Sequence, residues 1–568
     1  MRYFALACDY DGTLAEHGQV TDATVEALER LRKSGRRLLL VSGRQLDDLI
    51  SVFPQIHLFD VVVAENGAVL WDGATPDGQS FADPPPEEFV QELRRRGVTP
   101  VSVGHAIVAT WEPHEQTVLQ TIRDLRLELQ VIFNKGAVMV LPTGVNKASG
   151  LVRGLEQLKL SAHNTVGVGD AENDQAFLAM CECAVAVSNA LDSVKLRADW
   201  VTQGDHGTGV VELIDQLIAT DLSELSPALK RHRIVIGQAD DGSDVYLESE
   251  DANVLVGGLS GSGKTTVTTA LLERLLAAGI QFCVIDPEGD FDKFPKAIAL
   301  RSGDTRALAD GVMNVLEHPA QNAVVNLMDL RLADQPSFLQ RLLPRLLELR
   351  TAIGRPHWIV IDEAHHLLPA SSHTADEILA ALRRNVLLVT VHPEHVAQAA
   401  LSAVQTVLIV GRQPQATVDA FERGSGKSIG RLPVGRENGN DVWLVGTETS
   451  PVRFRPIQPT AERQRHHRKY AEGQLGEDML GNNLLQVRIG GVCILLEQRA
   501  YLTVISCEHG NGIVRLMPCP IVGMHMLDHG RCSSPLYAQR QSVAELSQGM
   551  LHNGRKLYTM AIWLMRVW

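Results

Sequence analysis

Short apolar runs alternate with amphipathic stretches along the first two hundred residues of the chain. The apolar runs FALACDYDG, RRLLLVSGR and VVVAENGAVL are separated by stretches such as TVEALERLRKSG, in which apolar positions recur at helical spacing. Strand-length runs that alternate with helical stretches predict parallel strands joined by crossover helices. This part of the chain is therefore predicted to be an α/β domain.

The alternating pattern is interrupted once, after Trp71. The segment DGATPDGQSFADPPPEEF is rich in Pro, Gly and Asp, a composition typical of an exposed excursion. A smaller α/β unit is expected from about Glu87 to Leu141, and the strand pattern then resumes with NTVGVGDAENDQAF. We therefore predict an insertion within the first domain.

A second α/β pattern follows a polar linker at 219–231 and extends over about 232–458. It contains three apolar runs that each end in a turn, NVLVGGLSGSGKTT, FCVIDPEGDF and HWIVIDEAHHLL. A charged linker, 459–475, then leads to the tail at 476–568, which holds four of the eight cysteines and seven of the twelve methionines. Two hypotheses fit the tail: a small domain of β-hairpins, or a shifted reading frame.

Composition limits the classes of partner. The 568 residues are 45% hydrophobic and 21% charged, as expected for a globular chain of two or three domains. The net charge of −14 provides no long-range positive field to attract nucleic acid. We find no secretory signal and no apolar run of membrane-spanning length, and the cysteines lack metal-ligand spacing. We therefore expect a cytoplasmic protein that does not bind membranes.

The first candidate site begins where the run FALAC ends in two acids. Asp9 and Asp11 lie one residue apart and would repel each other unless a divalent cation such as Mg²⁺ lay beside them. Asp9 is predicted to attack phosphorus and form an aspartyl phosphate. Asp11 is predicted to protonate the leaving oxygen and later to deprotonate the hydrolytic water.

Further elements follow in an order that suits phosphoryl transfer. Ser42 ends the next apolar run, in VSGR, and can donate a hydrogen bond to a phosphate oxygen. Lys147 supplies positive charge against the charge that develops on the transferred group. The segment GVGDAENDQAF adds Asp170 as a metal ligand, Asn173 as a phosphate ligand, and Asp174 as a further ligand or a support for the others.

Together these motifs, with AENGA at 64–68, resemble the haloacid dehalogenase superfamily, in particular the Cof-type (IIB) phosphatases, over residues 1–218. The resemblance implies a Rossmann-like core with an inserted α/β cap at about 72–141, which would select a small phosphorylated metabolite. It also implies a magnesium ion held by Asp9, Asp170 and the main-chain carbonyl of Asp11.

A nucleotide site is predicted in the second block. GLSGSGKT fits G-x-x-x-x-G-K-[ST], follows an apolar strand and precedes a helical stretch. Lys264 would contact the β and γ phosphates of ATP, Thr265 and Asp362 would bind magnesium, and Glu363 would polarise the attacking water. The ATP-binding residues predicted from the loop are Gly258, Gly261, Ser262, Gly263, Lys264, Thr265 and Thr266.

The second block resembles the HerA-like ATPases, relatives of FtsK, which implies a RecA-like P-loop domain. Such proteins commonly form hexameric rings that move nucleic acid, and Arg412, Arg383 or Arg384 is a candidate to reach a neighbouring subunit's nucleotide. Two departures weaken the motor hypothesis: no amino-terminal barrel is present, and His392 stands where a glutamine is usual.

Two functions remain open. The first is a magnesium-dependent phosphatase fused to an ATP-hydrolysing module, and the second is a ring-forming nucleic-acid translocase whose phosphatase processes phosphate ends or nucleotides. Nucleic acid and a homo-oligomer thus stay open as partners. RGSGKS at 423–428 is expected to be a solvated turn rather than a second P-loop, and the rings of His365 and His366 are expected to point apart.

Overall fold

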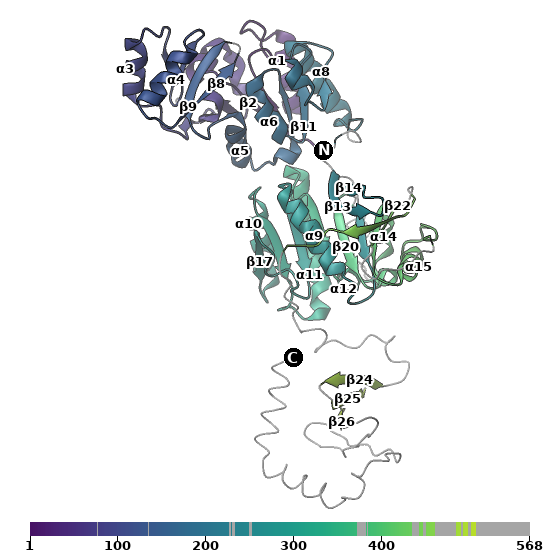
Figure 1. The fold of residues 1–568 in the computed structure, drawn as a ribbon. Helices are drawn as coiled ribbons and strands as arrows, with labels where there is room; N and C mark the ends of the chain where they lie inside the picture. The colour runs from purple at the N-terminus through teal and green to yellow at the C-terminus, as the bar shows by residue number, and fades with distance from the viewer. Residues whose placement is uncertain are drawn as a thin grey trace, which may run out of the picture. The chain divides into compact units, whose positions relative to one another are not determined.

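The computed structural model describes residues 1–75, 78–134, 136–225, 229, 233–248, 253–371, 382, 384–433, 442–446 and 450–460, and the backbone of three strands beyond them. The chain divides into two units, Met1–Gln464 and Arg465–Trp568, and each is described by itself. Among the described residues, the first unit contains two large sheets and one small sheet, and the second contains one sheet (Figure 1).

The first sheet has eight strands in the order β12-β11-β10-β1-β2-β3-β4-β5. Its strands from β12 to β3 are parallel, and β4 and β5 extend it in antiparallel fashion. Strands β1, β3 and β10 are buried throughout, as expected where helices cover both faces of a parallel sheet. The strands are β1 (Ala5–Cys8), β2 (Arg37–Val41), β3 (Val61–Ala64), β4 (Val69–Trp71), β5 (Gln79–Ser80), β10 (Thr165–Gly169), β11 (Cys183–Ala186) and β12 (Trp200–Val201).

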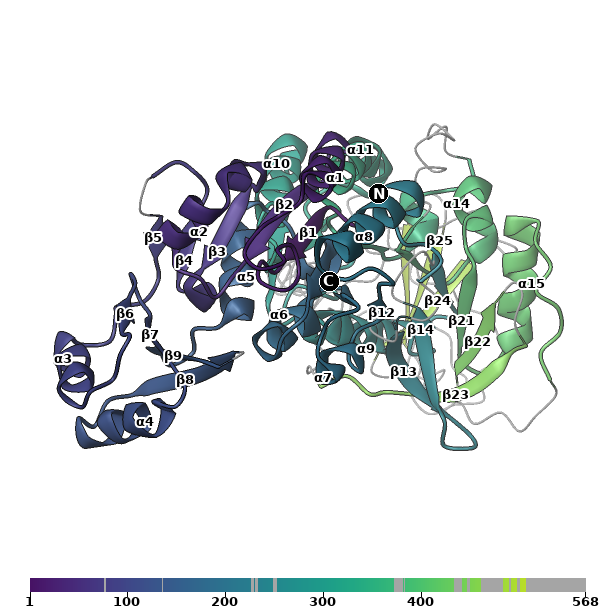
Figure 2. The ribbon, with the colours of Figure 1, turned by 90° about the horizontal axis from the view of Figure 1, so that it is seen from above.

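Helices pack in pairs against this sheet. Helix α1 (Asp22–Lys33) packs beside α8 (His206–Thr220), and α5 (Lys147–Gln157) packs beside α6 (Gln175–Met180) (Figure 2). Helix α1 starts at the N-cap Thr21, whose hydroxyl accepts a hydrogen bond from the Thr24 N–H, and it buries Ala27, Leu28 and Leu31. The shorter helices are α2 (Leu46–Val52) and α7 (Asp192–Lys195).

The inserted unit is a cap with its own four-stranded antiparallel sheet, ordered β6-β7-β9-β8 (Figure 2). One face packs on the helices through a separate apolar core that includes Phe89, Val118 and Val138. Gln79 and Ser80 belong to the core sheet, so the polar excursion after Trp71 returns to the core before the cap begins. The cap elements are α3 (Glu87–Arg95), β6 (Ser102–Val103), β7 (Val108–Trp111), α4 (Glu115–Asp124), β8 (Leu129–Asn134) and β9 (Ala137–Pro142).

The second large sheet has eleven strands in the order β14-β13-β23-β22-β21-β15-β20-β19-β16-β18-β17. Its seven strands from β21 to β17 are parallel, and β20 separates β15 from β19. The parallel strands are β15 (Val254–Gly257), β16 (Phe282–Asp286), β17 (Ala297–Arg301), β18 (Asn322–Asn326), β19 (Trp358–Ile361), β20 (Val386–Thr390) and β21 (Thr406–Val410). The antiparallel edge consists of β13 (Arg233–Ala239), β14 (Asp244–Glu248), β22 (Val442–Gly446) and β23 (Val452–Pro456). The helices are α9 (Lys264–Ala277), α10 (Thr305–Leu316), α11 (Gln335–Ile353), α12 (Ala364–Leu367), α14 (Gln398–Ser402) and α15 (Pro414–Ser425). The predicted class, an α/β core with a cap followed by a P-loop domain, is confirmed.

In the second unit, β24 (Leu484–Ile489), β25 (Val492–Glu497) and β26 (Tyr501–Ser506) form an antiparallel sheet. These strands lie in the tail at 476–568, for which a domain of β-hairpins was one hypothesis, whereas the hypothesis of a shifted reading frame stays a prediction. Across the described part of the chain, no helix has both the length and the apolar character needed to span a bilayer.

Candidate active sites

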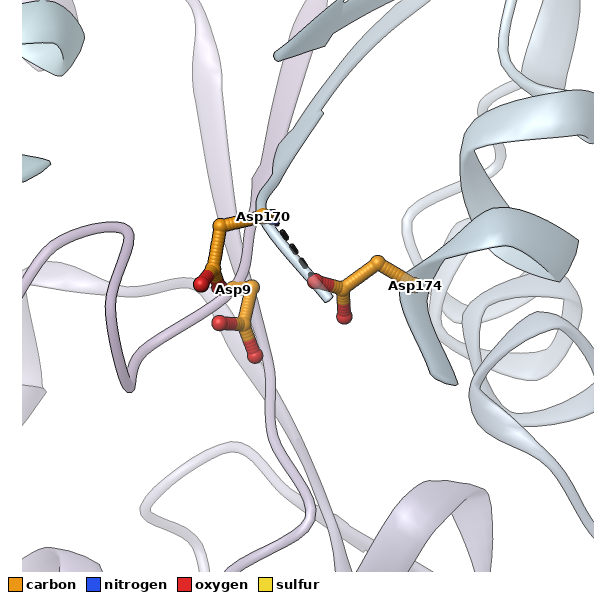
Figure 3. A group of neighbouring side chains, drawn as sticks. All are labelled: Asp9, Asp170 and Asp174. Atoms are coloured by element: carbon orange, nitrogen blue, oxygen red, sulfur yellow. Dashed lines mark hydrogen bonds between the residues drawn. The ribbon is translucent and has the colours of Figure 1, made fainter. Parts of the chain in front are cut away.

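The first candidate site lies where two neighbouring parallel strands of the eight-stranded sheet end. Asp9 directly follows β1 and Asp170 directly follows β10, so both carboxylates lie at the same edge of the sheet. Figure 3 shows Asp9 and Asp170 side by side, with Asp174 facing them from the next segment. Each of the three acids can offer one oxygen so that these atoms all lie within 4.8 Å of one another, and all three residues are buried.

Lys147 joins these acids. It opens α5, which is capped by Asn146, and its Nζ donates to Asp9 Oδ1 at 2.5 Å and to Asp174 Oδ1 at 2.6 Å. Burial alone would lower the pKa of Lys147, but Asp174 and Asp9 outweigh this effect and raise the pKa above its ordinary value. The lysine is therefore charged at neutral pH.

Asp174 holds the loop that carries Asp170. Its Oδ2 accepts the backbone N–H groups of Asp170 and Ala171, both at 2.9 Å, while its Oδ1 accepts from Lys147. A Cβ at Gly169 would lie 2.8 Å from Asp174 Oδ2, so this close approach requires glycine. Since both oxygens of Asp174 are engaged, this residue is better suited to orienting the loop than to binding an ion directly.

The donor set fits a hard divalent cation. Burial, followed by the charges of Asp174 and Asp170, raises the pKa of Asp9 well above its ordinary value, although Lys147 opposes the rise. A cluster of buried carboxylates that disfavours ionisation is stabilised by a divalent cation, and carboxylate oxygens are the ligands that Mg²⁺ prefers. Asp9 and Asp170 are the residues that could hold it.

The remaining predicted phosphate ligands lie at the same edge of the sheet. Ser42 follows β2, the strand beside β1, and its buried Oγ accepts the Arg44 N–H at 3.1 Å. Asn173 lies in the short helix η4 (Glu172–Asp174), and its Nδ2 donates to Asn66 Oδ1 at 3.2 Å. The Oδ1 of Asn173 is buried without a hydrogen-bond partner among the described residues; as an acceptor it suits a donor group of a ligand, whereas a phosphate oxygen would accept from the Nδ2 group.

Asp11 is held by an arginine to which the sequence analysis gave no role. Arg44 donates from Nε to Asp11 Oδ2 at 2.6 Å and from Nη2 to Asp11 Oδ1 at 2.7 Å, and its Nη1 also bonds Asp48. Asp11 does not belong to the group of three acids described above. This bidentate pairing fixes the carboxylate of the predicted acid and base. The only hint in the sequence was the position of Arg44, two residues after Ser42.

Replacing Arg44 by lysine should lower kcat for an alkyl phosphate about tenfold, because lysine keeps the charge but cannot form the two-pronged bond that orients Asp11. The loss should be smaller with p-nitrophenyl phosphate, whose leaving group needs little protonation. Initial-rate kinetics with both substrates measure this difference. The control is Arg37→Lys, since Arg37 is an exposed arginine paired with Asp60; equal losses for both substrates would contradict the role assigned to Arg44.

The second candidate site is the loop between β15 and α9. Gly258, Gly261 and Gly263 have φ angles of 156°, 75° and 108°, and a Cβ at Gly258 would lie 2.1 Å from the carbonyl oxygen of Val410. Lys264 and Thr265 begin α9, followed by Thr266, so backbone N–H groups at a helix start face any bound phosphate. The Oγ of Ser262 is buried without a hydrogen-bond partner among the described residues, as expected for a cradle that a phosphate completes.

Acidic side chains lie at the ends of β19 and β16, two parallel strands of the same sheet that lie beyond β20 from β15. Asp362 and Glu363 follow β19, and Asp286 ends the neighbouring β16. Burial, followed by the charges of Glu363 and Asp286, raises the pKa of Asp362, and burial raises that of Asp286 to about 7. Thr265 Oγ1 donates to Asp290 Oδ2 at 3.3 Å. Asp286 and Asp290 lie in the segment DPEGDF, and no role was predicted for either acid.

The expectation that His365 and His366 point apart is wrong. Their ring centroids are 4.0 Å apart, because α12 is a single turn that starts at Ala364, after the left-handed N-cap Glu363, whose φ is 44°. His365 Nδ1 lies 3.1 Å from Thr390 Oγ1 and 3.4 Å from Glu363 Oε2, and the ring of His392 lies 5.4 Å from that of His365. Of these imidazoles, His365 lies beside the carboxylate of the predicted catalytic glutamate.

Other candidates from the sequence lie outside this loop. The segment at 423–428 ends α15 instead of opening a helix, and Lys427 Nζ donates to the Val404 carbonyl, which agrees with a turn and not with a P-loop. Arg412 is exposed just after β21, and the carbonyl of Arg384 accepts a hydrogen bond from Arg350. Arg383 and the basic run that starts at Arg463 lie outside the described residues.

Comparisons with known proteins cover both domains. A family model described as haloacid dehalogenase-like hydrolase matches residues 6–94 and 103–214, and one described as AAA ATPase domain matches residues 245–389. The phosphoglycolate phosphatase of Haloarcula marismortui is 30% identical over 220 residues, which cover 37% of this chain and 95% of that protein. The phosphoglycolate phosphatase of Methanothermobacter thermautotrophicus is 29% identical over 219 residues, covering 37% of this chain and 96% of that protein.

Among solved structures, a haloacid dehalogenase-like hydrolase from Bacteroides thetaiotaomicron is 18% identical to this chain, with a TM-score of 0.34. The match covers 38% of this chain and 99% of that one, and we base no conclusion on a similarity of this level. The family model and the 30% identity extend over nearly the whole of the phosphatase segment. The chain belongs to the haloacid dehalogenase-like hydrolases, and it is an enzyme that joins a phosphatase of this family to an AAA ATPase domain.

Proposed function

We propose that residues 1–218 hydrolyse a small phosphate monoester through an aspartyl-phosphate intermediate on Asp9. The observation that carries this proposal is the buried Lys147 ammonium, which bonds both Asp9 and Asp174 beside Asp170. A positive group that contacts the nucleophile also lies where equatorial phosphate charge would develop. A purely structural ion pair would not need a second and a third carboxylate within a few ångströms.

In the proposed reaction, a carboxylate oxygen of Asp9 attacks phosphorus, and the bond from phosphorus to the ester oxygen breaks. Asp11, oriented by Arg44, gives its proton to the leaving alkoxide. Asp11 then removes a proton from water, the water oxygen attacks phosphorus, and the bond from phosphorus to Asp9 breaks to release inorganic phosphate. Ser42, Asn173 and Lys147 would hold the phosphate oxygens.

Magnesium is the proposed cofactor, held by Asp9, Asp170 and the main-chain carbonyl of Asp11. When bound, such a cation neutralises charge on the phosphate and on the acids around it. The orientation of Asp170 does not depend on the ion, because Thr13 Oγ1 donates to Asp170 Oδ1 at 3.2 Å and Asp174 holds its backbone.

Phosphoglycolate is the first substrate to test, because the relatives described above are named for that activity. We expect phosphate release from phosphoglycolate with Mg²⁺ and loss of release with excess EDTA. The comparison panel contains sugar phosphates, nucleotides and 3′-phosphorylated oligonucleotides, and each is tested with and without ATP. Release confined to oligonucleotides would contradict the proposal of a small metabolite and favour a phosphatase that processes nucleic-acid ends.

For residues 232–458 we propose a HerA-like module that binds and hydrolyses ATP. Supports are the loop at 258–266, the acids Asp362 and Glu363, and the strand β20 between β15 and β19. In this proposal Thr265 and Asp362 hold magnesium and Glu363 polarises water. The rate of ATP hydrolysis with and without duplex DNA distinguishes two roles for this module. A translocase should hydrolyse ATP faster with DNA, and this stimulation should weaken steeply as the salt concentration rises. Hydrolysis that does not depend on DNA would favour a module that regulates the phosphatase or is coupled to it. Sedimentation with and without ATP would show whether the module assembles into rings.

A further inference from the structure

The turn AENG, which begins with the last residue of β3 and leads into β4 of the core sheet, forms hydrogen bonds to the cap. Glu65 and Asn66 lie in the short helix η2 (Glu65–Gly67), and both have left-handed backbones, with φ of 51° and 52°. Consecutive non-glycine residues rarely adopt this conformation unless surrounding contacts fix them. Both side chains are buried, with exposed fractions of 0% and 1%.

The carboxylate of Glu65 binds three successive backbone N–H groups of the cap. Oε1 accepts from His105 at 2.9 Å, and Oε2 accepts from Ala106 at 2.8 Å and Ile107 at 3.1 Å. These residues form the turn between β6 and β7, which closes with a hydrogen bond from Gly104 N–H to the Ile107 carbonyl. Converging peptide N–H groups form a nest that suits a carboxylate, and charge-assisted bonds of this kind are strong.

The same turn is bonded to the phosphate site. The Glu65 N–H donates to the Arg44 carbonyl at 2.9 Å, and the Asn66 N–H donates to the Ser42 carbonyl at 3.0 Å. The Asn66 side chain accepts from Asn173 and donates to the sulfur of Met139 on the cap strand β9. The turn therefore contacts the cap on one side, and on the other it contacts Arg44 and the two predicted phosphate ligands Ser42 and Asn173.

We propose that Glu65 is a positioning residue that latches the cap over the phosphatase site. Glu65 bonds the cap by its side chain and Arg44 by its backbone, so the cap and the segment that orients Asp11 are fixed by one residue. Closure of a cap excludes water from the phosphoryl group and completes the substrate pocket. This inference rests on the proposed phosphatase function for its kinetic consequence, but not for its structural one.

Replacing Glu65 by glutamine puts an NH₂ group against peptide N–H donors, so the latch should weaken while the size of the side chain is kept. We expect the amides of His105, Ala106 and Ile107 to exchange with deuterium at least about tenfold faster, while the amides of β1 and β10 keep their rates. KM for the substrate should rise about fivefold, with a smaller change in kcat, because fewer molecules are closed before substrate binds. The matched control is Glu92→Gln, which removes bonds to Arg95 and Arg96 within the cap.

A second pair of variants keeps the inference testable if Glu65→Gln folds poorly. A Cβ at Gly104 would lie 2.6 Å from Glu65 Oε1, so Gly104→Ala should loosen the same three amides. In the Glu65→Ala background the obstructing carboxylate is gone, and Gly104→Ala should add no further loosening. Additive effects of the two substitutions would overturn the latch.

Two further results would overturn the inference. The first is that the three cap amides of Glu65→Gln exchange with deuterium at the same rate as in the wild-type protein. The second is that the amides of β1 and β10 also exchange faster in Glu65→Gln, and by the same factor, which would show a general loss of stability. If wild-type enzyme releases no phosphate from any substrate of the panel, the proposed function fails, while the exchange of these three amides still decides whether Glu65 latches the cap.

Discussion

Replacing Asp9 by asparagine should lower kcat for phosphate release by at least about 10⁴-fold, because an amide cannot form the acyl phosphate. The side chain is buried at the end of β1 and bonded to Lys147, so no neighbouring group replaces it geometrically. Asp170 is held in its own position by Thr13 and by the bond from its backbone to Asp174, and Asp174 is held by Lys147. Initial rates of phosphate release measure the loss.

Acid quenching during turnover tests the intermediate itself. Wild-type enzyme given ³²P-labelled substrate should retain label that hydroxylamine releases, as expected of an acyl phosphate, and Asp9→Asn should retain none. Asp215→Asn is the matched control, because Asp215 is an exposed aspartate on α8 paired with Arg30. Label that persists in Asp9→Asn would assign the nucleophile to another residue.

The fold should survive this substitution. Burial and the neighbouring carboxylates raise the pKa of Asp9 above its unfolded value, so the ionised side chain opposes folding at neutral pH in the absence of a cation. Asparagine carries no charge, so this unfavourable contribution to the free energy of folding is absent, and Lys147 still bonds Asp174. We therefore expect the melting temperature in metal-free buffer at pH 7 not to fall, and calorimetry of the two proteins measures this.

The sequence predicts the edge of the first sheet well because the relevant residues directly follow apolar runs. Carboxyl ends of neighbouring parallel strands meet at one edge, so placing Asp9 after β1 and Asp170 after β10 already brings them together. The contact of Lys147 with Asp9 could not be predicted from spacing alone, since it depends on how α5 packs beside the sheet. The resemblance to the haloacid dehalogenase superfamily placed Lys147 in the same site as Asp9, and the structure shows the contact.

Contacts between segments far apart along the chain were not predictable in the same way. The Arg44 guanidinium meets Asp11 across 33 positions, and Glu65 meets the cap turn across about 40, through backbone N–H groups that any sequence offers. The clustering of His365 with His366 was mispredicted because a regular helix was assumed where α12 has a single turn. Side-chain directions in irregular turns depend on backbone angles that periodicity does not encode.

Lys264→Ala should lower ATP hydrolysis by at least about 10²-fold, the loss expected when one charged group on a developing phosphate charge is removed. Lys264 begins α9, where the helix dipole and the backbone N–H groups of the first turn favour an anion, and its Nζ lies 3.2 Å from the carbonyl oxygen of Leu259, at the start of the same loop. ATP binding should weaken as well. Phosphate release at the Asp9 site without ATP should be unchanged, since Asp9 follows β1 of the eight-stranded sheet, whereas Lys264 begins α9, after β15 of the eleven-stranded sheet.

The chain provides an internal control, because the tetrapeptide GSGK occurs twice, at 261–264 and at 424–427. Lys427 follows the end of α15, where the dipole disfavours an anion, and its Nζ bonds the Val404 carbonyl. Lys427→Ala should therefore leave ATP hydrolysis unchanged, although both lysines have the same three residues before them. Two results would contradict this explanation: loss of ATP hydrolysis in Lys427→Ala, or unchanged ATP hydrolysis in Lys264→Ala. Either result would show that nucleotide binding does not depend on whether GSGK lies at the start or at the end of a helix.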